Sequence, residues 1–396
     1  MKVGILGGGQ LGRMMALAGY PLGLRFRFLD PSPDAPGGQV GEHICASYDD
    51  AEALKKFADG IDVATYEFEN VPAASAAAIR ARVPLYPPPE ALATAQDRLI
   101  QKNWFKTLDI ATAPFADADN RRDLERAVAD VGLPAVIKTR RFGYDGKGQF
   151  VLRSWHELDA AWKAVGGLSA PDGKLPLIVE GFVSFQRELS IIAARGRDGS
   201  TVFYPVVENH HRGGILRLTI APAPDISSAL QAEAERMASR VFDALHYVGV
   251  LTIELFQHEG KLLANEMATR VHNSGHWSIE GAVTSQFENH VRAVCGLPLG
   301  SCSPLPSREG VGGGVSGVTA MVNLIGDTPD AAQVLAQNGM HLHLYGKSGK
   351  APGRKLGHIT LTEPDLPALN ERLKVLAGLP GAEFPLPTAN TKTPRH

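Results

Sequence analysis

The stretch TIELFQHEGKLLANEM, residues 252–267, decides the fold, because apolar and β-branched residues lie on both sides of the turn-forming segment His258-Glu259-Gly260. This pattern is typical of a β-hairpin. If the hairpin is symmetric about Gly260, Glu254 and Glu266 are direct cross-strand partners with Cβ atoms about 4.5–5.5 Å apart. Two carboxylates placed in this way repel each other, so the stretch indicates a binding site as well as a fold.

A divalent cation would remove this repulsion. The residues around the pair are apolar, so water cannot easily screen the two charges, and Mg²⁺ prefers oxygen ligands together with phosphate oxygens. We therefore expect Glu254 and Glu266 to hold Mg²⁺ or Mn²⁺, with a further oxygen from Asn273. The alternative is a pair of outward-facing glutamates on an exposed hairpin.

The segment after the hairpin places hydrogen-bond donors next to the expected metal site. It reads RVHNSGH (270–276) and contains Arg270, His272 and Asn273. Positive charge there would stabilise an anionic intermediate. A purely structural role for the histidines is the alternative.

A glycine-rich loop earlier in the chain is typical of phosphate binding. Lys138 ends an apolar strand, and the loop GYDGKGQ (143–149) begins five residues later. Glycines let backbone N–H groups approach phosphate oxygens closely, and lysines add positive charge. The loop lacks the G-K-[ST] of a P-loop, and a simple hairpin turn is the alternative.

The strand LIVEGFV (177–183) indicates a place for a nucleoside. It breaks at Gly181, where backbone groups could hydrogen-bond an adenine edge while apolar side chains cover its face. Glu188 begins the next strand and could accept hydrogen bonds from two ribose hydroxyls. For Glu180 and Glu188 the alternative is a solvent-exposed strand end.

The order of expected elements divides the chain into three domains. Strands and helices alternate over residues 1–95, which predicts a parallel α/β sheet, and a proline cluster ends this part near residue 89. Residues 96–305 contain a helix over 91–108 that crosses the boundary, then mostly antiparallel strands. These include one strand over 201–209 and a lid subdomain at about 110–185. Residues 306–396 form a small β-rich domain after a Gly-, Ser- and Pro-rich linker.

Near the N-terminus, GGGQLG (7–12) satisfies G-x-G-x-x-G, follows a strand and opens a helix, and Asp30 ends the next strand. This pattern also predicts an NAD-dependent dehydrogenase. The alternative is a helix N-terminus that needs glycines for a tight turn and holds another anion. The phosphate and metal residues elsewhere favour the alternative.

A basic cluster near the C-terminus resembles a clamp for a phosphomonoester. Lys347, Lys350, Arg354 and Lys355 lie within nine residues and are spaced by glycines. A solvated basic loop is the alternative. Nucleic acid is not expected, because the net charge is −2 and Tyr345 is the one aromatic residue near the cluster.

Composition is that of a globular protein, with 44% hydrophobic and 21% charged residues among 396. The three cysteines, Cys45, Cys295 and Cys302, form no C-x-x-C pattern, which favours a reducing compartment. We expect a cytoplasmic protein without a signal peptide, and no membrane contact, because no apolar stretch reaches about 18 residues.

Taken together, these segments resemble the N5-carboxyaminoimidazole ribonucleotide synthetases of the ATP-grasp superfamily. The resemblance runs from residue 1 to about 385 and rests on a series of motifs in a fixed order. They are GGGQLGRM (7–14), TYEFENVP (65–72), DRLIQK (97–102), GYDGKGQ (143–149), STVFYPVVEN (200–209), NEMATRVHNSGHW (265–277) and PGRKLGH (352–358). It implies an ATP-grasp fold of α/β and α+β class, with a Rossmann-like pre-ATP-grasp domain and a small C-terminal β-rich domain. One departure is Phe142, where a second glycine is commoner.

The resemblance also implies the site residues. ATP would be bound by Arg98, Lys138, Gly143, Tyr144, Asp145, Gly146, Lys147, Gly148, Gln149, Glu180, Gly181, Phe182, Val183, Glu188, His211, Asn265 and Glu266. The aminoimidazole ribonucleotide would be surrounded by Gln10, Leu11, Tyr144, Asp145, Arg270, His272, Asn273, Lys347 and Arg354. The catalytic residues would be Asp145, Arg270 and His272, with Asp145 as the proton acceptor.

The implied reaction is an ATP- and bicarbonate-dependent carboxylation in purine biosynthesis, carried out by a homodimer with the glycine-rich loop as a lid. Three alternatives remain open at this stage. They are a formate-dependent glycinamide ribonucleotide ligase of the same superfamily, the NAD-dependent dehydrogenase, and a non-catalytic nucleotide-binding regulator.

Overall fold

The N-terminal part of the computed structural model is a parallel α/β domain, as predicted. The structure describes residues 1–141, 143, 148–167, 174–305 and 317–386. The first sheet has the order β3-β2-β1-β4 and is parallel throughout. Its elements are β1 (Lys2–Leu6), β2 (Arg25–Asp30), β3 (Glu42–Cys45), β4 (Val63–Tyr66), α1 (Gln10–Gly19), α2 (Ala51–Ala58) and α3 (Ala73–Arg80).

Two helices, α4 (Pro89–Gln96) and α5 (Arg98–Thr107), lead out of this domain. The prediction of one helix over 91–108 is wrong, because the chain breaks at Asp97. The backbone of Asp97 is extended, and its side chain caps α5 by accepting from the N–H groups of Leu99 and Ile100. Such a cap satisfies amides that a new helix leaves without partners.

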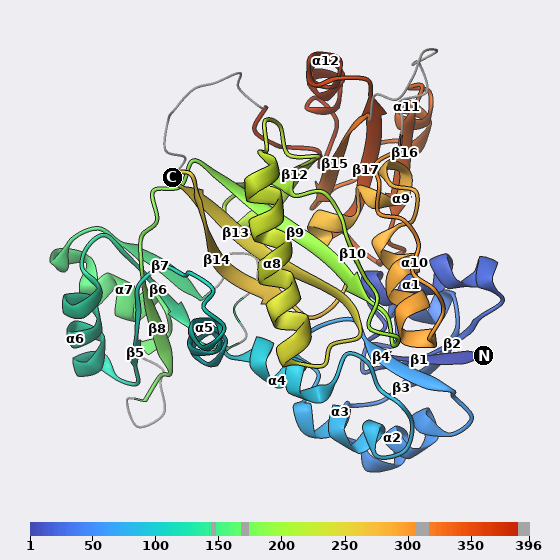
Figure 1. Ribbon diagram of the computed structural model, residues 1–396, viewed down its shortest axis with the longest axis horizontal. Coiled ribbons are helices and arrows are strands. Elements are labelled where there is room, and N and C mark those ends of the chain that lie inside the picture. Colours follow the sequence, from blue (N-terminus) through green and yellow to red (C-terminus); the bar gives the residue numbers. More distant parts are fainter. Residues whose placement is uncertain (142, 144–147, 168–173, 306–316, 387–396) are drawn as a thin grey trace.

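A small antiparallel sheet with two helices on it follows, seen in green at the left of Figure 1. Its strand order is β5-β8-β6-β7. A core that includes Leu124, Ile137 and Val179 joins the helices to the sheet. The elements are β5 (Phe115–Ala118), α6 (Arg121–Val131), β6 (Ala135–Thr139), β7 (Gln149–Leu152), α7 (Leu158–Ala164) and β8 (Leu177–Gly181).

The largest element is an antiparallel sheet of nine strands that reaches from the centre of the molecule to its C-terminal part. Its order is β14-β13-β9-β11-β12-β15-β17-β16, and β10 pairs with β9. The strands are β9 (Arg187–Arg195), β10 (Thr201–Phe203), β11 (Val207–Arg212), β12 (Ile215–Ala221), β13 (Gly249–His258), β14 (Lys261–Ala268), β15 (Val318–Ile325), β16 (Met340–Leu344) and β17 (Lys355–Glu363). Because β12 pairs with β15, the C-terminal strands continue the central sheet.

The predicted single strand over 201–209 is two strands, β10 and β11. Pro205 lies between them and has no N–H group to donate, so the pairing with β9 stops after Tyr204 and resumes at Val207.

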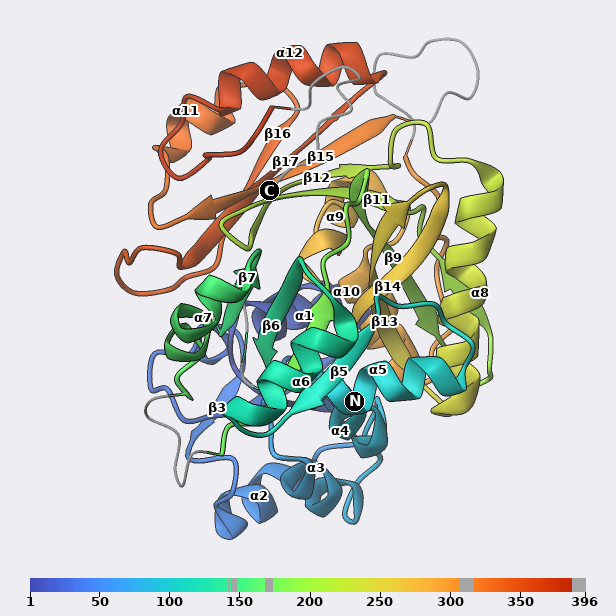
Figure 2. The ribbon, with the colours of Figure 1, turned by 90° about the vertical axis from the view of Figure 1, so that its left-hand side faces the viewer.

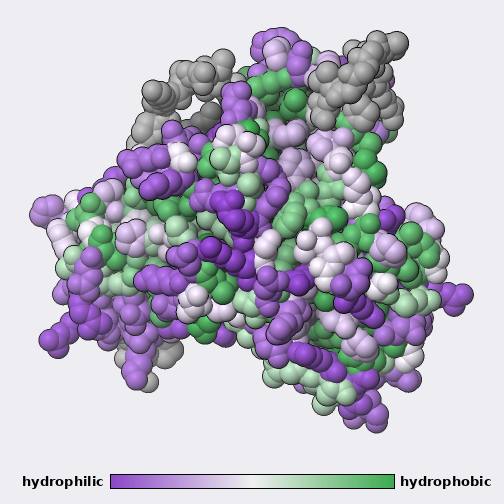
Figure 3. Space-filling model, in the orientation of Figure 1, coloured by the Kyte–Doolittle hydropathy of each residue, from purple (hydrophilic) through white to green (hydrophobic). Residues whose placement is uncertain are grey.

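Helices cover the central sheet, and Figures 1 and 2 show the long α8 packed along it. The helices of this part are α8 (Ser228–Ala244), α9 (Ser278–Gly281), α10 (Gln286–Cys295), α11 (Ala331–Leu335) and α12 (Leu366–Leu376). Within the described ranges, no helix combines the length and apolar character needed to cross a membrane. On the face seen in Figure 3, hydrophobic residues lie among hydrophilic ones.

Candidate active site

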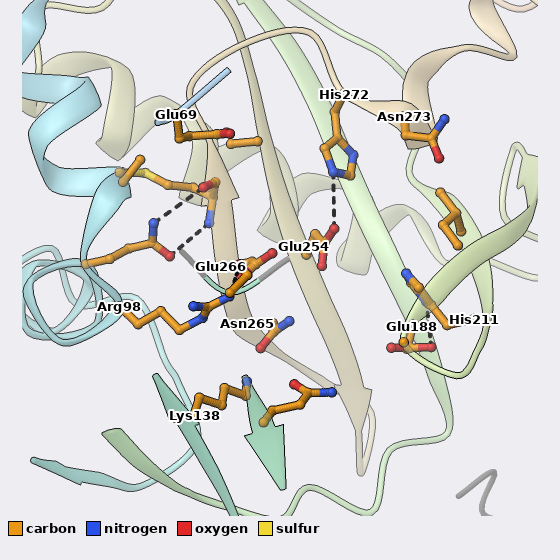
Figure 4. A pocket seen from close by; sticks show the side chains of 18 of the residues that line it. Glu69, Arg98, Lys138, Glu188, His211, Glu254, Asn265, Glu266, His272 and Asn273 are labelled. Carbon is orange, nitrogen blue, oxygen red and sulfur yellow. Dashed lines mark hydrogen bonds and ion pairs between the residues drawn. The ribbon is translucent and has the colours of Figure 1, made fainter. Parts of the chain in front are cut away.

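A cavity of about 530 Å³ lies where the three parts of the molecule meet. Its lining combines residues that are far apart in the sequence, including Gln10 of the first domain, Lys138 of the small sheet and Glu254 of the central sheet. Figure 4 shows the side chains that carry charge into this space. Most of the predicted site residues line it, namely Gln10, Leu11, Arg98, Lys138, Gly143, Gln149, Glu180, Gly181, Phe182, Val183, Glu188, His211, Glu254, Asn265, Glu266, Arg270, His272 and Asn273.

The hairpin β13–β14 pairs Glu254 directly with Glu266, as predicted. The predicted turn is wrong, however. His258 pairs with Lys261, so the loop is the two-residue Glu259-Gly260 with φ of +48° and +75°, and the hairpin is not symmetric about Gly260. A bulge at Asn265 shifts the register by one residue and brings the two glutamates opposite each other.

The two carboxylates have opposite environments. Burial alone would raise the pKa of Glu254, but the hydrogen bond and charge of His272, 3.3 Å from its Oε1, lower that pKa to about 2. Burial and the charge of Glu254 raise the pKa of Glu266, although Arg98 at 3.7 Å opposes this. The free protein thus holds an ionised carboxylate opposite one that is hard to ionise.

These groups fit a divalent cation that also binds a nucleotide. Among the described residues, no group of three or more His, Cys, Asp or Glu side chains has the arrangement of a metal site. Two carboxylates with phosphate oxygens as further ligands are, however, a common way to bind Mg²⁺. The predicted third ligand, Asn273, lines the cavity, and its side chain exchanges hydrogen bonds of 2.6 and 3.0 Å with Asn323.

Glu180, near the end of the interior strand β8 of the small sheet, lies between two lysines. Its carboxylate is 2.8 Å from the Nζ of Lys138 and 3.5 Å from the Nζ of Lys102. Burial opposes ionisation, but the charges of Lys138 and Lys102 lower the pKa of Glu180 to about 2. Glu180 is only 4% exposed, so the alternative of a solvent-exposed strand end is wrong. Sequence reasoning missed Lys102, although it ends the DRLIQK motif.

The part of the cavity where we predicted a nucleoside is partly aromatic. Phe185 and Phe256 stack with ring centroids 4.8 Å apart and line the cavity together with Val183. Nearby, the Nδ1 of His211 is 2.9 Å from a carboxylate oxygen of Glu188. Burial opposes protonation, but Glu188 raises the pKa of His211. The two phenylalanines were missed, since nothing in the sequence distinguishes them from core residues.

Arg270 is held by a carboxylate that sequence reasoning did not select. Its Nε and Nη2 each lie 2.8 Å from the Oε2 of Glu69, which follows β4 in the TYEFENVP motif. Both residues line the cavity. Glu69 therefore fixes the direction of the guanidinium group.

The basic cluster lies mostly outside the cavity. Lys355 lines it, whereas Lys347 donates to the carbonyl of Lys355 (2.9 Å), and Arg354 donates to carbonyls of its own loop. Lys350 forms an ion pair with Asp327. The ribonucleotide-binding roles of Lys347 and Arg354 stay predictions.

Only parts of the predicted glycine-rich loop can be placed. Gly143 and Gln149 line the cavity, and the carbonyl of Gly148 accepts from the N–H of Thr139 at 2.8 Å. Phe142 and the predicted residues Tyr144, Asp145, Gly146 and Lys147 lie outside the described residues.

The glycine motif at the N-terminus is filled by the protein's own carboxylates. Gly8 donates to Asp30 (2.8 Å), and Gly9 and Gly12 both donate to Glu67. A dinucleotide would need these N–H groups for its pyrophosphate. The alternative of another anion is therefore favoured over the NAD-dependent dehydrogenase.

Three successive segments of the chain each match a known family. Residues 1–96 match the family described as a ribonucleotide synthetase preATP-grasp domain, and residues 103–287 match an ATP-grasp domain. Residues 319–372 match a phosphoribosylaminoimidazole carboxylase C-terminal domain.

Similar proteins cover almost the whole chain. An N5-carboxyaminoimidazole ribonucleotide synthase of Pseudomonas aeruginosa is 50% identical over 96% of this chain and 99% of its own. The crystal structure of such a synthetase from Thermus thermophilus shares 56% identity, with a TM-score of 0.87 over 96% of this chain and 98% of that chain. One from Aspergillus clavatus, in complex with ADP and 5-aminoimidazole ribonucleotide, shares 30% identity, with a TM-score of 0.83 over 94% and 97%.

Proposed function

Because this chain belongs to the N5-carboxyaminoimidazole ribonucleotide synthase family of ATP-grasp ligases, we propose that its cavity uses ATP and bicarbonate to carboxylate 5-aminoimidazole ribonucleotide in de novo purine biosynthesis. The observation that carries this proposal is the pair Glu254 and Glu266, set opposite each other within a cavity that also contains Lys138 and Arg98. Two carboxylates and two cationic side chains that line one cavity are suited to a polyphosphate with its metal ion.

In the first step, a bicarbonate oxygen attacks the γ-phosphorus of ATP, the bond to the β-phosphate oxygen breaks, and carboxyphosphate and ADP form. Phosphoryl transfer needs mainly positioning and charge stabilisation. Lys138 and Arg98 supply fixed positive charge for the phosphate oxygens, while Glu254 and Glu266 would hold the metal ion. Bound there, Mg²⁺ or Mn²⁺ would neutralise further charge on the phosphates.

In the second step, carboxyphosphate releases CO₂ and phosphate, and the exocyclic amine of the ribonucleotide attacks the carbon of CO₂. The amine loses one proton, and we assign Asp145 as its acceptor because of the family motif GYDGKGQ. Arg270, held by Glu69, and His272 would stabilise negative charge in this half of the cavity. As the family resemblance implies, the glycine-rich loop would act as a lid that excludes water.

The decisive experiment is an ADP-release assay with aminoimidazole ribonucleotide, with and without bicarbonate, and with the carboxylated product measured directly. We expect ADP and product to form together and only with bicarbonate. The formate-dependent rival predicts ADP release with glycinamide ribonucleotide and formate instead. ADP release that ignores bicarbonate would refute the proposal.

Two further parts of the proposal concern the cellular location and the oligomeric state. We propose a cytoplasmic homodimer, as the family resemblance implies. Sedimentation of the purified enzyme would contradict the dimer if it gave a mass near the 42.3 kDa of one chain.

A further inference from the structure

The glycine motif at the N-terminus is a feature that the proposed reaction does not use. Glu67 directly follows β4 and is 6% exposed. One carboxylate oxygen accepts from the N–H of Gly9, and the other accepts from Gly12 at 2.6 Å. The carboxylate therefore takes the position at the start of α1 that an anionic ligand would otherwise take.

The glycines of this motif are fitted to the glutamate. A Cβ added at Gly9 would lie 2.4 Å from the Oε1 of Glu67, and one added at Gly7 would lie 2.4 Å from its Cγ. Gly7 also has a φ of +99°, which side chains rarely adopt. Hence the G-x-G-x-x-G pattern of this chain makes room for an internal carboxylate.

Glu67 also joins two segments that line the cavity. Gln10 and Leu11, at the start of α1, belong to one of them, and Phe68 and Glu69, which follow Glu67 in the chain, belong to the other. The backbone N–H of Glu67 bonds to the carbonyl of Leu6 (3.0 Å), which ties the end of β4 to the end of β1. Glu69, two residues later, holds Arg270.

We infer that Glu67 is a positioning residue for the ribonucleotide half of the reaction. By fastening α1 to the segment after β4, it sets the direction of Glu69 and, through it, of Arg270. This inference rests on the proposed function, because it assigns the Arg270 side of the cavity to the ribonucleotide. The groups of the ATP half, such as Lys138 and Glu180, lie on the small sheet and have no contact with Glu67 among the hydrogen bonds and ion pairs of the described residues.

The test is Glu67→Gln, in which an amide replaces the carboxylate and one of the two N–H groups loses its acceptor. We expect the KM for aminoimidazole ribonucleotide to rise about tenfold or more, as when a charge-assisted hydrogen bond is lost, and the KM for ATP to change less than about twofold. The matched control is Asp62→Asn. Asp62 also accepts a backbone N–H, from Lys2 (2.6 Å), but at the opposite end of β1.

Equal changes of both KM values in Glu67→Gln would show a merely structural role, and unchanged values would show none; either result overturns the inference. If this variant does not fold, Glu67→Asp is measured in the same way, because it keeps the charge but is too short to reach both N–H groups. Failure of the proposed function is recognised separately, since the unmodified enzyme would then release no ADP in response to bicarbonate.

Discussion

The start of α1 and the hairpin β13–β14 both bring acidic side chains to places that suit a ligand, but they do so in opposite ways. At α1 the carboxylates of Asp30 and Glu67 meet backbone N–H groups of the same chain. At the hairpin, Glu254 and Glu266 meet each other. The carboxylates at α1 are occupied by backbone N–H groups, whereas the hairpin sets two carboxylates opposite each other in the lining of the cavity, so a sequence motif alone does not mark a site.

The largest effect is expected from Glu266→Gln. We expect activity to fall by about 10²–10³-fold, the loss typical of removing one charge-stabilising group from an active site. The ligand-free variant should melt no earlier than the unmodified protein, because the substitution removes a carboxyl group whose ionisation is opposed by burial and by the charge of Glu254. ADP release and thermal melting measure the two effects.

The control for this variant is Glu259→Gln, which changes an exposed glutamate in the turn of the same hairpin and should leave activity unchanged. A Glu266→Gln enzyme that stays active, or that melts several degrees lower, would contradict the view that the pair exists for a ligand.

A smaller effect is expected from Lys138→Met. If Lys138 faces the phosphates as we propose, its removal should raise the KM for ATP about 10–100-fold, the range for a charge-assisted hydrogen bond. The KM for the ribonucleotide should change little. Lys163→Met, on the exposed side of α7 in the same subdomain, is the control. If ATP binding is unaffected, Lys138 only neutralises the charge of Glu180 and is not part of the ATP site.

Acid stability should test the ion pairs of Glu180, with a still smaller effect. The pKa of Glu180 is about 2 in the folded protein and is near 4.5 when it is unfolded, so its ion pairs stabilise the fold above pH 4.5 and are lost as the pH falls toward 2. The difference in melting temperature between the unmodified protein and Glu180→Gln should therefore shrink as the pH is lowered from 6 to about 3. A difference that stays constant over this range would show that the ion pairs contribute nothing.

No effect at all is expected from NADH. Because Glu67 and Asp30 occupy the N–H groups of the glycine motif, millimolar NADH should produce no saturable change in its fluorescence when the protein is added. A saturable signal would show that these carboxylates can be displaced and that the start of α1 is an open site.

Much of the fold could be predicted, because the hydrophobic periodicities of the strands and the hairpin lie within short stretches. The pairing of Glu254 with Glu266 was also predicted, but for an incomplete reason. The two-residue turn alone would place Asn265 opposite Glu254, and only the bulge restores the pair. A bulge depends on packing and side-chain contacts from elsewhere in the chain, which the local pattern does not contain.

The contacts that join distant segments could not be predicted. Lys102 reaches Glu180 across 78 positions of sequence, and Glu69 reaches Arg270 across 201, so neither partner looks unusual in its own segment. The glycine motif misled for the same reason, since its partner, Glu67, is 55 residues beyond Gly12. Glu188 and His211 were predicted from the family resemblance and do lie together in the cavity. A family resemblance can predict such contacts because it already contains information about which distant segments meet.

The hydrogen bonds between β12 and β15 tie the end of the chain to its middle. A fragment cut after residue 305 would leave the edge of β12 unpaired, and an unpaired edge invites aggregation. It would also remove Asn323, which holds the side chain of Asn273 and the carbonyl of Leu216. The C-terminal strands therefore stabilise the half of the sheet that lines the cavity. Shortened versions of this enzyme should have residues removed only from loops, so that all strands of the sheet are kept.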